Sequence, residues 1–132
     1  MFMDPNKWYL SCPPLGSAEE PHGLVVYRIA ESDPPGAKDF QSHFELGKPL
    51  PRKVDKCRWR SISVYENLVD ARKTAAFLTK KRNLQALYIA QGTLEAAHGV
   101  VLHTPSNGDS HHDWWPCDNV DRLQPFAVIE QV

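Results

Sequence analysis

The sequence has no apolar run that approaches the roughly 20 residues needed to cross a bilayer. Its first residues, MFMDPNKWYLSCPP, also lack the basic region and the continuous apolar stretch of a signal peptide. The chain contains no internal repeat and no low-complexity segment. We therefore expect a cytoplasmic protein that has no membrane partner.

Cysteine is scarce as well. The three cysteines, Cys12, Cys57 and Cys117, form no metal-binding or redox motif, and at least one must stay unpaired. Reduced thiols in a cytoplasm are the simplest interpretation. Cys117 follows a proline and stands near histidines, so a catalytic thiolate is an alternative for that residue.

Size and composition are those of one globular domain. The chain has 132 residues, of which 42% are hydrophobic and 23% charged. The net charge of −1 is unevenly distributed, because residues 52–82 hold ten of the fifteen Lys and Arg but only three acids. This basic segment predicts either a phosphate-bearing partner or a solvated helix face followed by a loop. No RNA-binding motif accompanies the charge, so sequence-specific reading of nucleic acid has no support.

Apolar periodicity predicts two helices and five strands after a Pro- and Gly-rich arm at residues 1–23. The expected strands are 23–30, 59–65, 85–91, 99–104 and 125–132, and the expected helices are 37–46 and 67–82. In the second strand, Ser61, Ser63 and Tyr65 alternate with Ile62 and Val64 and so lie on the opposite face. We predict a single α+β domain over 24–132, with a mostly antiparallel sheet of five to six strands and two helices.

Arg28 stands out because it interrupts an apolar strand, GLVVYRIA. A guanidinium on a core strand must find an anion or reach solvent, since a buried, unpaired charge costs several kcal/mol. One interpretation is a structural ion pair with an acidic side chain of the chain itself. The other is a clamp for a phosphate or carboxylate ligand, to which the planar guanidinium is well suited.

Several short motifs, taken in order, resemble the ADP-ribosyltransferase-like fold. They are VYR on an early strand, RSISVYENLVDARKTAAFL as a Ser-x-Ser strand leading into a helix, the strands LYIAQ and GVVLHT, and a late acidic-aromatic segment. The same order resembles small uncharacterised bacterial proteins with a YR strand and a late His- and Trp-containing segment. The resemblance spans roughly residues 24–131 and implies a cleft for NAD or a related nucleotide.

The resemblance implies a role for each matching residue. Arg28 would contact the pyrophosphate or the nicotinamide ribose, Ser61 and Ser63 would hold the ribose and the sheet geometry, and Tyr65 would offer an aromatic face to the nicotinamide. NAD is then the expected cofactor, and no metal is expected.

The late carboxylate is where this chain departs from the family pattern, because His112-Asp113-Trp114-Trp115 replaces the Glu-containing motif. Asp113 or His112 would act on the substrate, and Trp114 or Trp115 would stack on it. The enzymatic alternatives implied are an ADP-ribosyltransferase and an NAD glycohydrolase. Because the glutamate is missing, nucleotide binding is the firmer expectation.

The stretch HTPSNGDSHHDWWPCD at 103–118 admits other interpretations. Zinc would need His103, one of the adjacent pair His111 and His112, and Asp113 or Cys117, a spacing unlike that of common zinc sites. The stretch also suits a loop whose tryptophans cap the core while its histidines face water. A third interpretation is a recognition surface for a protein or nucleic acid, formed by the Trp-His loop 111–115 or by the basic segment 52–82.

Overall fold

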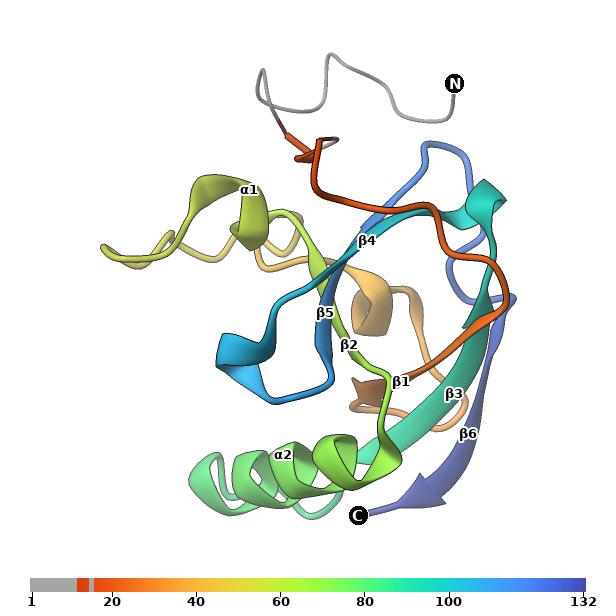
Figure 1. Cartoon of the computed structure of the whole chain (residues 1–132). Coiled ribbons are helices and arrows are strands. Elements are labelled where there is room, and N and C mark those ends of the chain that lie inside the picture. Colours follow the sequence, from red (N-terminus) through yellow and green to blue (C-terminus); the bar gives the residue numbers. More distant parts are fainter. Residues whose placement is uncertain (1–11, 15) are drawn as a thin grey trace.

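Six strands pair into one sheet in the order β4-β5-β2-β1-β3-β6 (Figure 1). In this computed structural model, which describes residues 12–14 and 16–132, every pair of neighbouring strands is antiparallel. The strands are β1 (Leu24–Ala30), β2 (Ile62–Tyr65), β3 (Tyr88–Leu94), β4 (Gly99–His103), β5 (His111–Pro116) and β6 (Phe126–Gln131). With two α-helices, this confirms the predicted α+β domain.

The longer helix, α2 (Leu68–Lys81), lies against one face of the sheet at β1, β2 and β3 (Figure 1). The Asn67 side chain accepts a hydrogen bond from the amide of Val69 and so caps the helix start, as the sequence predicts. Ala71 and Ala75 are fully buried at the contact. Their small side chains let the helix approach the sheet closely.

The opposite face of the sheet carries the larger apolar core. Its buried residues come from all six strands and from the segment after β1, and they are Val26, Phe40, Ile62, Val64, Ala90, Leu94, Val101, Trp114 and Phe126. Ile62 and Val64 lie here, on the face predicted by the alternation in the second strand. Ser63 and Tyr65 consequently project toward the face that carries α2.

The helix predicted at 37–46 is wrong. Only Ala37–Phe40 forms a 3-10 turn, because side chains take over the backbone groups that a helix would use. Ser42 and Glu45 bond each other's backbone amides inside the predicted range. The Asp39 carboxylate accepts from the amides of Glu31 and Gly36, which ties the turn to the end of β1.

The second helix is instead α1 (Lys56–Trp59), which occupies the start of the strand predicted at 59–65. The Asp55 carboxylate caps α1 by accepting hydrogen bonds from the amides of Cys57 and Arg58. The strand therefore begins only at Ile62. Figure 1 shows α1 and the loop before it projecting from the body of the molecule.

The Trp-His loop expected at 111–115 is also wrong, because this segment belongs to the strand β5. Its six residues are all buried, since β5 lies between β4 and β2. His111 is 2% exposed and His112 is 8% exposed, so these two histidines do not face water, whereas His103 is exposed. Charged and aromatic residues in succession conceal the alternation by which a strand is usually recognised.

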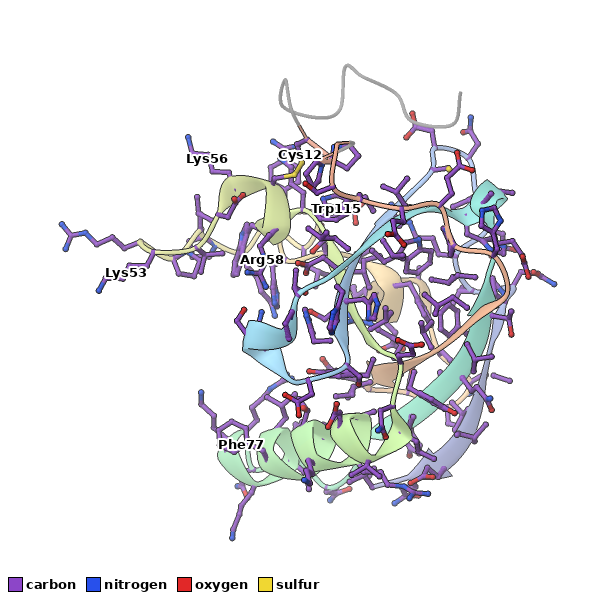
Figure 2. The ribbon with its side chains drawn as sticks, viewed as in Figure 1. Cys12, Lys53, Lys56, Arg58, Phe77 and Trp115 are labelled. Atoms are coloured by element: carbon purple, nitrogen blue, oxygen red, sulfur yellow. A yellow bond between two sulfur atoms is a disulfide. The ribbon has the colours of Figure 1, made fainter. Side chains whose placement is uncertain are left out.

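A disulfide joins Cys12 to Cys57, at the start of α1. The expectation of three reduced thiols is thus wrong for two of them. Figure 2 shows Cys12 and Trp115 close to this helix, and the Trp115 indole donates to the carbonyl oxygen of Cys57. The bond ties the N-terminal segment to the body of the fold.

Of the predicted arm at 1–23, residues 1–11 and 15 lie outside the described residues. In its described part, Glu19 and Val101 exchange two backbone hydrogen bonds, which add a bridge to the outer edge of β4. No helix within the described ranges is long and apolar enough to cross a membrane.

Candidate functional site

The strands β1 and β2 separate almost as soon as they pair. Their register contains a single residue pair, Tyr27 with Tyr65, whereas β1 and β3 stay paired along seven residues. The Arg28 guanidinium occupies the split: its Nε donates to the carbonyl oxygen of Asp39 at 2.8 Å, and its Nη1 donates to the carbonyl oxygen of Ser63 at 2.9 Å. Arg28 thus replaces the ladder that the two strands do not form.

A cavity of about 220 Å³ opens at this split, bounded by β1, β2, the end of α2 and the segment 38–48. Four residues proposed above for cofactor binding line it: Arg28, Ser61, Ser63 and Tyr65. The sequence reasoning missed the other polar lining residues, which are Lys38, Lys48, Arg82, His43, Ser42, Gln41, Glu31 and Asp39. No motif links these residues in sequence, since they come from an irregular segment and a helix end.

The cavity is electropositive. Four basic side chains line it against two carboxylates. One of the carboxylates, that of Asp39, already accepts hydrogen bonds from Ser32 Oγ at 2.7 Å and from two backbone amides. The other, that of Glu31, lies 3.5 Å from Arg82. An anion entering the cavity would therefore meet more cationic than anionic groups.

Burial and the positive charges around the cavity shift the pKa values of two of its lining residues, Arg28 and His43. Burial lowers the pKa of Arg28 to about 10, although the nearby charge of Asp39 acts in the opposite direction. At that pKa the guanidinium is still a cation at neutral pH. Burial also lowers the pKa of His43, and the positive charges of Lys48 and Arg28 lower it further. His43 is therefore neutral at pH 7, and a bound anion would raise its pKa.

Asp113 lies behind the cavity rather than in its lining. Ser61 Oγ is 2.7 Å from Asp113 Oδ1, and Arg58 Nε donates to Asp113 Oδ2 at 2.9 Å. The carboxylate is 4% exposed and holds α1 to the sheet through Arg58. This position fits a structural ion pair better than contact with a substrate.

Ser63 and His111 form a second polar contact between β2 and β5. Ser63 Oγ is 2.9 Å from His111 Nε2, and His111 Nδ1 is 2.7 Å from Thr104 Oγ1. The ring of Tyr65 meets that of His111 edge-on, with centroids 5.3 Å apart. The sequence marks His111 as a candidate metal ligand and as part of the Trp-His loop, but not as a partner of Ser63, because that contact depends on the pairing of β2 with β5.

His112 and Trp114 lie on the other face of the sheet from Ser63. Trp114 is completely buried in the core, and its indole donates to the carbonyl oxygen of His98. It cannot stack on a ligand in the cavity without unpacking that core. The His112 ring packs at 5.0 Å from that of His103, beside a second cavity of about 510 Å³ under the N-terminal segment.

The described part of the chain contains no group of three or more His, Cys, Asp or Glu side chains placed to hold a metal ion. Cys117 is buried, and burial raises the pKa of its thiol, as do the charges of Asp118 and Glu20. A thiol with a raised pKa is a poor nucleophile, which argues against the thiolate alternative.

The basic segment 52–82 is divided among the loop before α1, α1 itself and α2. Several of its side chains are occupied: Arg58 pairs with Asp113, Arg72 pairs with Glu130, and the Arg60 guanidinium lies over the ring of Phe44. Figure 2 shows Lys53 at the tip of the projecting loop and Lys56 at α1. The basic side chains of the segment are thus distributed over three elements, and several of them are held by contacts within the protein.

In comparisons with known proteins, no family model, curated protein or solved structure matches this chain.

Proposed function

We propose that the split between β1 and β2 binds a nucleotide-type anion, with NAD and ADP-ribose as the first candidates. The observation that carries this proposal is the state of Arg28. Within the described residues, the Arg28 guanidinium donates hydrogen bonds to two carbonyl oxygens and takes part in no ion pair. A buried cation that borders a cavity and has no bonded carboxylate favours an anionic ligand.

The volume of the cavity limits which part of the ligand fits. Typical ligand pockets span about 300–1,000 Å³, and this cavity is smaller, about 220 Å³. It therefore suits one phosphate-ribose or nicotinamide-ribose unit, with the rest of a dinucleotide outside. Ser61, Ser63 and Tyr65 supply hydroxyls for such a unit.

The proposal concerns ligand binding alone. It does not include transferase or glycohydrolase chemistry. Asp113 would have to leave Arg58 and Ser61 to reach a ligand in the cavity. His112 and Trp114 lie on the far side of the sheet. A cytoplasmic location remains a prediction, and the Cys12–Cys57 disulfide counts against it because such bonds persist mainly in oxidising compartments.

The test is a thermal-shift and calorimetric titration with NAD, ADP-ribose, nicotinamide and inorganic phosphate. A ligand specific for the folded state stabilises it by about 2.7 kcal/mol at one hundred times its Kd. Lys48→Met should weaken binding by about tenfold while leaving folding intact, since Lys48 is exposed. Arg72→Met, at an exposed arginine that does not line the cavity, is the matched control. Flat titrations at millimolar ligand would refute the proposal.

The alternative function is a protein- or nucleic-acid-binding module. Burial of β5 removes the Trp-His loop 111–115 as its surface, which leaves the basic segment 52–82. Binding to a phosphate backbone would weaken steeply with salt, whereas binding of one nucleotide would respond less. Titrating a single-stranded oligonucleotide at several salt concentrations therefore separates the two functions.

A further inference from the structure

Ser63, His111 and Thr104 form a hydrogen-bonded chain that begins at the cavity and ends inside the fold. The pairing of β2 with β5 sets Ser63 opposite Asp113 and Tyr65 opposite His111, so the histidine is the diagonal neighbour of the serine on one face. Ser63 lines the cavity, and His111 is 2% exposed. The serine thus borders the cavity, whereas the histidine is shielded from solvent.

Thr104 fixes the orientation of the imidazole. Its hydroxyl lies 2.7 Å from His111 Nδ1 and 3.5 Å from the carbonyl oxygen of His111. That carbonyl can only accept, so a hydroxyl that donates to it accepts from Nδ1–H. In this tautomer His111 Nε2 carries a lone pair directed at Ser63 Oγ, 2.9 Å away.

His111 is held in its neutral form. Burial lowers the pKa of the ring, and the charges of Arg58 and His112 act in the same direction. The charge of Asp113 and the bond with Thr104 oppose them without reversing the shift. A neutral imidazole at neutral pH is able to take a proton from a bound hydroxyl.

We propose that Ser63 is a nucleophile for acyl transfer, with His111 as its general base and Thr104 as the residue that positions the base. A hydroxyl, a base within hydrogen-bond reach and a third group that orients the base are the parts that such chemistry requires. The cations Lys38, Lys48 and Arg82 line the same cavity, so the substrate class is a carboxylic ester that carries a negative charge.

The reaction balances within these groups and water. Ser63 Oγ bonds to the ester carbonyl carbon as its proton passes to His111 Nε2. The carbon–oxygen bond to the leaving alcohol then breaks, and His111 returns the proton to that oxygen. Water attacks the acyl-serine with its proton taken by His111, which then protonates Ser63 Oγ and releases the carboxylic acid.

The first test is covalent labelling of the full chain with a fluorophosphonate, in which a Ser63 oxygen–phosphorus bond replaces the phosphorus–fluorine bond. Peptide mass spectrometry should find the label on Ser63. Ser63→Ala should abolish it, whereas Ser106→Ala, at an exposed serine beyond β4, should not change it. Labelling on a different residue, or none under conditions that label a known serine hydrolase, would overturn the proposal.

The second test separates base catalysis from a structural role. Thr104→Val should slow labelling by about 10²-fold or more and shift its pH profile, and Thr104→Ser should restore both. Equal labelling rates for wild type and Thr104→Val would exclude the positioning role. Hydrolysis of mono-4-nitrophenyl glutarate should exceed that of 4-nitrophenyl acetate by about tenfold, because only the glutarate ester carries a carboxylate. The reverse preference would exclude an anionic substrate. Neither outcome depends on whether NAD binds.

Discussion

Arg58 Nε donates to Asp113 Oδ2 across 2.9 Å and thereby joins α1 to the middle of β5. The carboxylate is almost inaccessible at 4% exposure, whereas 32% of the Arg58 side chain is exposed. Ser61 Oγ donates a hydrogen bond to the other carboxylate oxygen, Asp113 Oδ1. This pair places the acidic residue of the late aromatic segment in a structural position.

Asp113→Asn should therefore destabilise the fold. Loss of one partner of a buried pair costs about 3–5 kcal/mol, and we expect about 2–3 kcal/mol here because Arg58 reaches solvent. Urea denaturation measures the change. Glu130→Gln, which breaks the more exposed pair with Arg72, should cost clearly less. If Asp113→Asn kept full stability and lost only ligand binding, Asp113 would belong to the site after all.

Reduction of the Cys12–Cys57 disulfide should also lower the free energy of unfolding. The bond spans 45 residues of sequence, and a loop of that size constrains the unfolded chain by up to about 4 kcal/mol. Urea curves with and without dithiothreitol should differ by about 2–4 kcal/mol. Cys57→Ser should make stability insensitive to the reductant, whereas Cys117→Ser should leave the effect in place. No response of the wild type would show that the bond contributes nothing.

We expect the ion pair between Glu45 and Arg122 to contribute less to the stability of the fold at acidic pH. Burial on its own raises the pKa of Glu45, but the hydrogen bonds from Arg122 and Ser42 outweigh it and lower the pKa below 4.5. A lowered carboxyl pKa stabilises the fold above the unfolded value and loses that contribution as pH falls through the folded value. The difference in Tm between wild type and Glu45→Gln should therefore shrink below about pH 4.5.

The exposed Glu20 provides the control for this experiment, because Glu20→Gln removes a carboxylate without breaking a described ion pair. Its Tm should follow the wild-type curve over the same pH range. A Glu45→Gln difference that stayed constant down to pH 3 would contradict the assignment of this acid response to Glu45.

Gly99→Ala should disrupt the start of β4. Gly99 has φ +129°, and a Cβ there would clash with the carbonyl oxygen of Trp115 and lie 2.9 Å from the Cα of Pro116. Both obstacles are backbone, so relief requires moving β5, and we expect a loss of at least about 2 kcal/mol. Gly36→Ala, which meets only Ser32 Oγ at 3.9 Å, should change stability little. If the Gly99→Ala protein kept wild-type stability, the backbone of β5 would have to shift at little energetic cost.

Local patterns determined much of this fold. The apolar run at Leu24–Ala30 and the cap and apolar stripe of α2 identify their elements without tertiary information. The alternation of Ile62 and Val64 with Ser63 and Tyr65 correctly assigned the two faces of β2. These features are encoded within a few residues, where backbone propensity and side-chain period agree.

Tertiary structure decided the remainder. His111–Pro116 is a strand because two neighbours bury it, and its charged and aromatic residues show no period of two. The side chains of Ser42 and Glu45 bond backbone amides inside the helix predicted at 37–46, and the segment becomes a loop that forms one wall of the cavity. The sequence singled out Arg28, Ser61, Ser63 and Tyr65. Only the pairing of β2 with β5 places Ser63 beside His111, and Asp113 beside Ser61 behind the cavity. Each contact joins residues about fifty positions apart, so no local pattern predicts it.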